Sequence, residues 1–120
     1  MRLFPKRETA FTGEFVRDLK AAFGDSLWLF KVHGHEMQAK GVPDVVCCIN
    51  GLFVGIEFKI RRGSVNITPY QKYTKECIEK ANGFSFIVWF DEATAVVGID
   101  ELKFNDRKEA IKFLLARFKP

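Results

Sequence analysis

The sequence has little of what marks a membrane, secreted or zinc-binding protein. No apolar run approaches the ~18 residues that a membrane-spanning helix needs. The basic residues of the opening MRLFPKR are not followed by the long apolar stretch of a secretory signal. The three cysteines have no CxxC spacing, which argues against a zinc site or a disulfide framework. We therefore expect a cytoplasmic protein with reduced thiols.

Linkers, repeats and low-complexity tracts are also absent, and this favours a single domain over residues 1–120. Apolar residues make up 48% of the chain and charged residues 28%, a ratio typical of a folded globular protein. Thirteen phenylalanines supply bulk for a sizeable core. The net charge of +4 permits a polyanionic partner without requiring one.

Periodicity and capping residues predict three helices. Apolar residues at three- and four-residue spacing predict a helix over 9–23. Residues 68–71, Thr-Pro-Tyr-Gln, have the pattern of a helix N-terminus with a capping box, and this helix is expected to end at Asn82. Asp106 is the expected N-cap of a last helix with an apolar stripe over 110–118.

Short apolar and aromatic runs predict five strands. They cover residues 26–32, the two segments that flank Asn50-Gly51, residues 84–90 and residues 94–99. The order of elements is helix, three strands, helix, strand, strand, helix. This order predicts a small α/β domain in which helices flank one central mixed sheet.

The Asn50-Gly51 pair, a strong hairpin signal, predicts which side chains share a face of the sheet. If these two residues form the turn, the numbers of paired residues sum to 101. Asp44 then lies opposite Glu57, with their Cβ atoms ~4.5–5.5 Å apart, and Lys59 lies further along the same face. The other face of the hairpin is entirely apolar, and we expect it to belong to the core.

Two carboxylates that face each other across paired strands repel. A divalent cation between Asp44 and Glu57 would remove this cost, because Mg²⁺ favours carboxylate oxygens and retains several waters. Phe58 lies between Glu57 and Lys59 in the sequence and can offer such a cation only its main-chain carbonyl. Lys59 could orient a water or neutralise charge on a phosphate. The alternative is a solvated strand end at which Lys59 screens two acids.

These motifs together carry a family resemblance. Residues 41–44 (Gly-Val-Pro-Asp), the Asn50-Gly51 hairpin, residues 57–59 (Glu-Phe-Lys) and residues 68–71 resemble the PD-(D/E)xK nucleases. They look most like the virus-type replication-repair nuclease (VRR-NUC) branch in its standalone phage or bacterial form. The matching stretch runs from about residue 40 to residue 89.

The resemblance implies a restriction-endonuclease-like core and divalent-metal-dependent hydrolysis of phosphodiester bonds in DNA. It implies that Asp44, Glu57 and the Phe58 carbonyl would hold Mg²⁺, with Mn²⁺ able to substitute. Lys59 would serve the attacking water.

Two further site residues follow from the resemblance, each with an ordinary alternative. Glu14, at the edge of the apolar stripe of the first helix, would touch the metal through water; it could equally be a solvated glutamate, and Asp18 competes for the role. Gln71 would help to orient the site, although it already has a structural role as the capping partner of Thr68.

Four basic residues are candidates for contact with the DNA backbone. They are Lys40, Arg61, Arg62 and Lys72. The alternative is a solvated, charged surface.

The leading hypothesis is a DNA endonuclease with a role such as DNA repair. Because a domain this small has little surface for reading a base sequence, recognition of branched DNA, such as a Holliday junction, fits best. The resemblance implies a possible homodimer that cuts two strands symmetrically. The alternatives are a non-catalytic nucleic-acid-binding domain that keeps the fold, and an α/β domain with an accidental charge pair.

Overall fold

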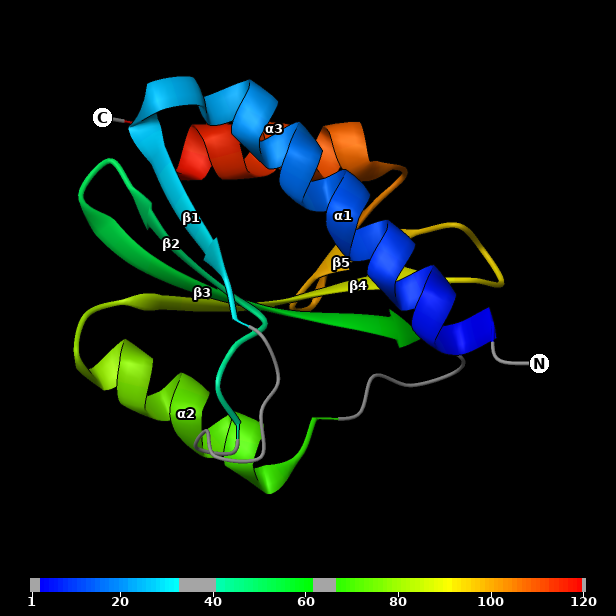
Figure 1. Ribbon diagram of the computed structural model, residues 1–120, viewed down its shortest axis with the longest axis horizontal. Helices are drawn as coiled ribbons and strands as arrows, with labels where there is room; N and C mark the ends of the chain where they lie inside the picture. The colour runs from blue at the N-terminus through cyan, green and yellow to red at the C-terminus, as the bar shows by residue number, and fades with distance from the viewer. Residues whose placement is uncertain (1–2, 33–40, 62–66, 120) are drawn as a thin grey trace.

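A six-stranded sheet lies at the centre of the molecule, between helices on both of its faces (Figure 1). The computed structural model describes residues 3–32, 41–61 and 67–119. In chain order the elements are α1 (Leu3–Phe23), a 3₁₀ turn (Gly24–Ser26), β1 (Leu27–Lys31), β2 (Val45–Ile49), β3 (Leu52–Arg61), α2 (Pro69–Lys80), β4 (Phe84–Asp91), β5 (Val97–Ile99), β6 (Leu102–Phe104) and α3 (Arg107–Arg117).

The strands lie in the sheet in their chain order, β1 to β6. Every neighbouring pair is antiparallel except β3 and β4, which are parallel and are joined by α2 as the crossover helix. Helices α1 and α3 cover one face of the sheet and α2 covers the other (Figure 1). The predicted α/β fold with one mixed sheet is therefore confirmed.

The predicted hairpin register is confirmed as well. Strands β2 and β3 pair from Val45 with Ile56 to Ile49 with Leu52, so that the paired numbers sum to 101. Asn50 and Gly51 form the turn with φ angles of 49° and 85°, the positive values that a tight type I′ turn requires.

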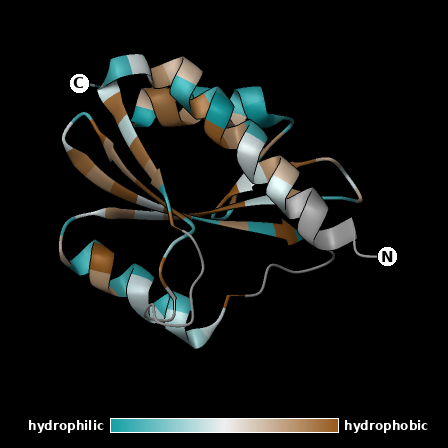
Figure 2. Ribbon diagram, viewed as in Figure 1, coloured by the Kyte–Doolittle hydropathy of each residue, from teal (hydrophilic) through white to brown (hydrophobic). Residues whose placement is uncertain are grey.

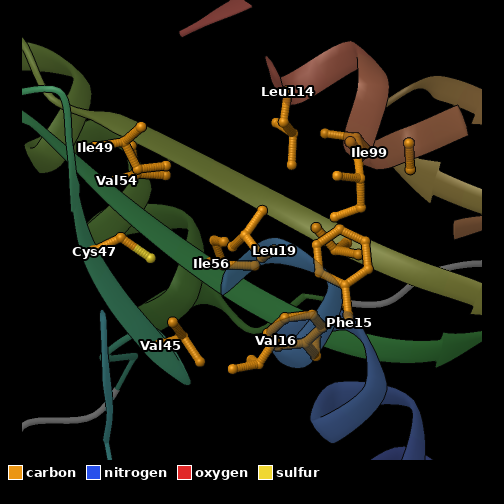
Figure 3. Close-up of a cluster of buried hydrophobic side chains, with 14 of the residues drawn as sticks. Phe15, Val16, Leu19, Val45, Cys47, Ile49, Val54, Ile56, Ile99 and Leu114 are labelled. Atoms are coloured by element: carbon orange, nitrogen blue, oxygen red, sulfur yellow. The ribbon is translucent and has the colours of Figure 1, made fainter. Parts of the chain in front are cut away.

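The core lies between the sheet and the α1–α3 layer. Figure 3 shows apolar side chains from α1, β2, β3, β5 and α3 meeting there, and Figure 2 shows hydrophobic residues throughout the central strands. Alternation places Ile56 and Phe58 of β3 in this core with about 1% of their surface exposed, and sends Glu57 and Lys59 to the α2 face. Successive residues of this one strand thus point alternately into the core and to the charged face.

Both capped helices begin where the sequence predicts. Thr68 and Gln71 form a complete capping box at the start of α2, and Asp106 caps α3 by accepting from the main-chain N–H of Glu109. None of the described helices is long and apolar enough to cross a membrane.

The structure differs from the predicted elements in two places. Helix α1 begins at Leu3 rather than at residue 9, and β5 covers only Val97–Ile99 and turns at Asp100 into a further strand, β6. This hairpin was missed because its turn, Asp100-Glu101, has no glycine, although Asp100 adopts a positive φ of 52°.

Candidate active site

Asp44 and Glu57 come together at one end of the β2–β3 hairpin, on the face that α2 covers. Asp44 directly precedes β2, and its Oδ2 accepts a hydrogen bond of 2.8 Å from the main-chain N–H of Phe58. The ladder itself ends one step earlier, at Val45 and Ile56. The side chain of Asp44 thus takes the place of a ladder bond and is held beside the Glu57–Phe58 peptide.

Close approaches of two glycines hold the segment before Asp44 in position. Gly41 has a φ of +85°, and a Cβ there would overlap the main-chain carbonyl of Tyr70 at the start of α2. A Cβ on Gly55 would lie 2.9 Å from Cγ of Pro43. The Gly-x-Pro-Asp sequence therefore has a steric reason, because it packs a turn of chain against both α2 and β3.

The Glu57 side chain has two polar neighbours. Gln71 Nε2 donates to Glu57 Oε2 over 2.7 Å, and Lys59 Nζ lies 3.7 Å from the same oxygen. Glu57 is 14% exposed and Lys59 23% exposed, so this pair is only partly screened by solvent. Lys59 and Gln71 therefore stabilise a carboxylate that Asp44 would otherwise destabilise.

Gln71 forms hydrogen bonds both to the N-terminus of α2 and to Glu57. Its Oε1 accepts from the main-chain N–H of Thr68 over 3.0 Å, while its Nε2 donates to Glu57. One amide therefore links the N-terminus of α2 to the catalytic candidate on β3.

The donors at this site fit a hard divalent cation. Carboxylate and carbonyl oxygens are the ligands that Mg²⁺ prefers, and Asp44 and Glu57 supply the carboxylates. In an extended strand the N–H and C=O of one residue point the same way, so the Phe58 carbonyl also faces the side on which Asp44 lies. Within residues 3–32, 41–61 and 67–119, no group of three or more His, Cys, Asp or Glu side chains could hold a metal.

Comparisons with known proteins identify the fold. No protein-family model matches the sequence, and a search of curated proteins finds no match. A solved structure described as a VRR_NUC domain superposes with a TM-score of 0.54 at 17% identity, over 88% of this chain and 95% of that one. The fold is that of a VRR_NUC domain. Another similar structure is Archaeoglobus fulgidus Hjc, a Holliday junction resolvase from an archaeal hyperthermophile, with a TM-score of 0.47 and 18% identity over 66% of this chain and 67% of that one.

Within this VRR_NUC fold, Glu14 is not brought to the carboxylate pair. It lies on α1, across the sheet from Glu57, and its Oε1 forms a 2.8 Å ion pair with Arg107 of α3. Asp18, the competing candidate, binds the same guanidinium at 2.9 Å. Both acids thus join α1 to α3, at the edge of the apolar stripe where the helical pattern placed Glu14.

Two of the four basic candidates, Arg61 and Lys72, fall within the described residues. Arg61 follows Glu57 and Lys59 on the same side of β3, with its guanidinium 4.8 Å from the ring centroid of Trp89 and its Nε 4.0 Å from Asp91. Lys72 is exposed on α2. Lys40 and Arg62 lie outside the described residues.

Lys75 is a further basic residue beside Glu57 and Gln71. It lies one turn after Gln71 on α2 and, with Glu57 and Gln71, lines the same small cavity. Its Nζ donates to the Ser85 carbonyl and lies 3.6 Å from Asp100. Its i, i+4 spacing from Gln71 places the two side chains on the same side of α2.

Proposed function

We propose that this chain is a divalent-metal-dependent endonuclease that hydrolyses phosphodiester bonds in branched DNA, with residues 1–120 forming one nuclease domain. The observation that carries the proposal is the convergence of Asp44, Glu57 and Lys59 at the end of one hairpin. Asp44 is held there by the Phe58 amide and Glu57 by Gln71. The VRR_NUC fold supports this proposal.

Asp44, Glu57 and the Phe58 carbonyl are the residues that would hold Mg²⁺ or Mn²⁺. A divalent ion bound there would supply Lewis-acid polarisation of the phosphate and activation of water. Asp44 and Glu57 would position such an ion and balance its charge. Phe58 keeps the donors in register because its ring is buried in the core.

Lys59 is the residue we assign to the reacting water. Its ammonium lies 3.7 Å from Glu57 and its side chain is 23% exposed, so it can reach a water or a phosphate oxygen at the mouth of the site. There it would orient the water and stabilise the negative charge that develops on the phosphate. Gln71 is a positioning residue that keeps the Glu57 carboxylate turned toward this point. Glu14 is left out of this machinery because Arg107 binds it on the other face of the sheet.

Backbone contacts are assigned to Lys40, Arg61, Arg62 and Lys72. Arg61 continues the row of Glu57 and Lys59 on β3, so a DNA strand that reaches the scissile position would pass over it. The preference for branched DNA, such as a Holliday junction, rests on the small size of the domain, which leaves little surface for sequence reading.

We propose a homodimer as the working assembly, because a two-fold dimer presents two sites to the two strands of a junction. Two aromatic side chains, Trp28 and Phe30, are exposed and stacked side by side on the edge strand β1. Exposed apolar patches are typical of protein contacts. The mass measured by light scattering should therefore be that of two chains, and a monomeric mass would contradict this assembly.

Cleavage assays test the proposed activity. Wild-type protein should cut a four-way DNA junction with Mg²⁺ or Mn²⁺ and should not cut it in EDTA. Junction binding without cutting in any metal would favour the second candidate, a nucleic-acid-binding domain that retains the fold. Cutting that persists in EDTA would refute the metal dependence.

A further inference from the structure

A cleft of about 640 Å³ lies next to the proposed catalytic residues, and of the residues that line it only Arg61 has a role in the mechanism above. Helix α2 forms one wall with Lys75, and the β5–β6 hairpin forms the other with Asp100 and Lys103. Ile87 and Trp89 of β4 form its floor. Its volume lies in the range that accommodates a small ligand, about 300–1,000 Å³.

The cleft adjoins the strand that carries Glu57 and Lys59. In the parallel register of β3 and β4, Ile87 lies beside Glu57 and Trp89 lies beside Lys59, and neighbouring strands are about 4.8 Å apart. Lys75 and Ile87 line both this cleft and the small cavity around Glu57. DNA bound at Glu57 therefore lies one β-strand away from this cleft.

The wall chemistry matches a nucleotide. Ile87 offers an apolar surface to a base or a sugar, and the buried Trp89 supports the Arg61 guanidinium beside it. The Arg61 guanidinium, held over the Trp89 ring, is a planar cation of the kind on which nucleobases stack. Lys103 is exposed at the rim and can meet a phosphate.

Acceptors are present on the same wall as the cation. Asp100 is half-buried at the β5–β6 turn, where its Oδ1 accepts from the main-chain N–H of Ile87 over 2.9 Å. The neighbouring Glu101 also lines the cleft. Carboxylate oxygens accept hydrogen bonds from the amino groups of bases. The cleft thus combines an apolar floor, the cations Arg61, Lys75 and Lys103, and the carboxylates of Glu79, Asp100 and Glu101.

We propose that this cleft is a subsite for the nucleotide that flanks the scissile phosphate, with Lys103 binding its phosphate and Arg61 stacking on its base. This inference rests on the proposed nuclease function. It makes β6 part of the DNA-binding surface, although the sequence analysis did not predict that strand.

Binding of a labelled four-way junction in EDTA, where no cutting is expected, tests the cationic rim. Lys103→Glu should weaken binding by roughly tenfold and reduce the slope of log affinity against log salt by about 0.9, the value for one lost phosphate contact. The matched control is Lys112→Glu, an exposed lysine on α3 across the sheet, which should leave binding unchanged. If the wild type binds and cuts the junction and both variants change its binding equally, the subsite is wrong and the proposed nuclease function still stands.

Two further arms examine the ligand. Two junction substrates test the base contact, each with one abasic nucleotide, placed on either the 5′ or the 3′ side of the scissile phosphate. One of the two should have a higher KM than the other, and equal KM values would overturn the base contact. Free deoxynucleoside monophosphate is the second arm. If it binds wild type, and Lys103→Glu removes that binding without weakening DNA binding, the cleft is a site for free nucleotide and the DNA subsite is wrong. Weak or undetectable competition by the monophosphate supports the DNA strand as the ligand.

Discussion

The two faces of the sheet differ in what β3 presents to them. On the α1–α3 face, Ile56 and Phe58 are about 1% exposed and pack into the core. On the α2 face, Glu57 and Lys59 are partly exposed and form polar contacts. One strand therefore both anchors the fold and carries the proposed catalytic groups.

Phe58 shows what this difference teaches. Its ring packs edge-on against Phe15 at 5.6 Å between centroids, while its main-chain N–H holds Asp44. Because a packed interior resists displacement, the buried face gives the exposed face its precision. Changes on the first face should cost stability, and changes on the second should cost activity.

The largest expected effect separates two glutamates on opposite faces. Glu57→Gln keeps the size of the side chain and removes a metal-binding charge, so cleavage of a four-way junction should fall by roughly a thousandfold. Lys59→Ala should behave alike, with unchanged thermal unfolding in both cases. Glu14→Gln is the matched control and should cut within a few-fold of wild type. A loss in Glu14→Gln as large as that in Glu57→Gln would return Glu14 to the catalytic site.

Two phenylalanines on β3 test the stability half of the comparison. Phe58→Ala should lower the free energy of unfolding by about 3–5 kcal/mol, because it leaves a cavity in the core. Phe53→Ala, on the α2 face and 45% exposed, should cost less than about 1 kcal/mol. Urea titration of both variants measures the difference. Similar losses would mean that the exposed face is also packed in solution.

A metal ion should stabilise the folded protein only by binding to residues on the α2 face of the sheet. An ion that binds the folded state adds about 2.7 kcal/mol at a concentration one hundred times its Kd, so Mg²⁺ or Mn²⁺ should raise the Tm of wild type. Asp44→Asn should lose most of this shift and still fold in EDTA, since an amide oxygen can accept from the Phe58 amide. Glu14→Gln should keep the shift. A shift that survives in Asp44→Asn would place the ion elsewhere.

Adjacent cysteines on β2 supply the smallest and most local test. Cys47 faces the core, and burial raises the pKa of its thiol to about 12, whereas Cys48 is exposed on the other face. Because the thiolate is the reactive form, an alkylating reagent at pH 8 should modify Cys48 and Cys77 and spare Cys47 until urea unfolds the chain. Equal rates at Cys47 and Cys48 in the folded protein would contradict the assignment of faces.

The sequence by itself determined the parts of the site that depend on local geometry. Asn50-Gly51 specifies a two-residue turn, and the period of two along a strand then sets which residues share a face. The placement of Asp44, Glu57 and Lys59 on one face followed from this register, as did the packing of the opposite face. The capping box of α2 is equally local, because it joins residues three apart.

Only the tertiary structure decided how distant elements meet. The position of Glu14 depends on Arg107, 93 residues away in the chain, and no periodic pattern encodes how α1 lies across the sheet. The contact of Gln71 with Glu57 depends on the close approach of Gly41 to the start of α2. The cleft beside Lys75 needs the β5–β6 hairpin, whose strands of three residues each are too short to carry a periodic signal. Local patterns specify faces and turns, whereas the packing of separate elements depends on contacts that span the whole chain.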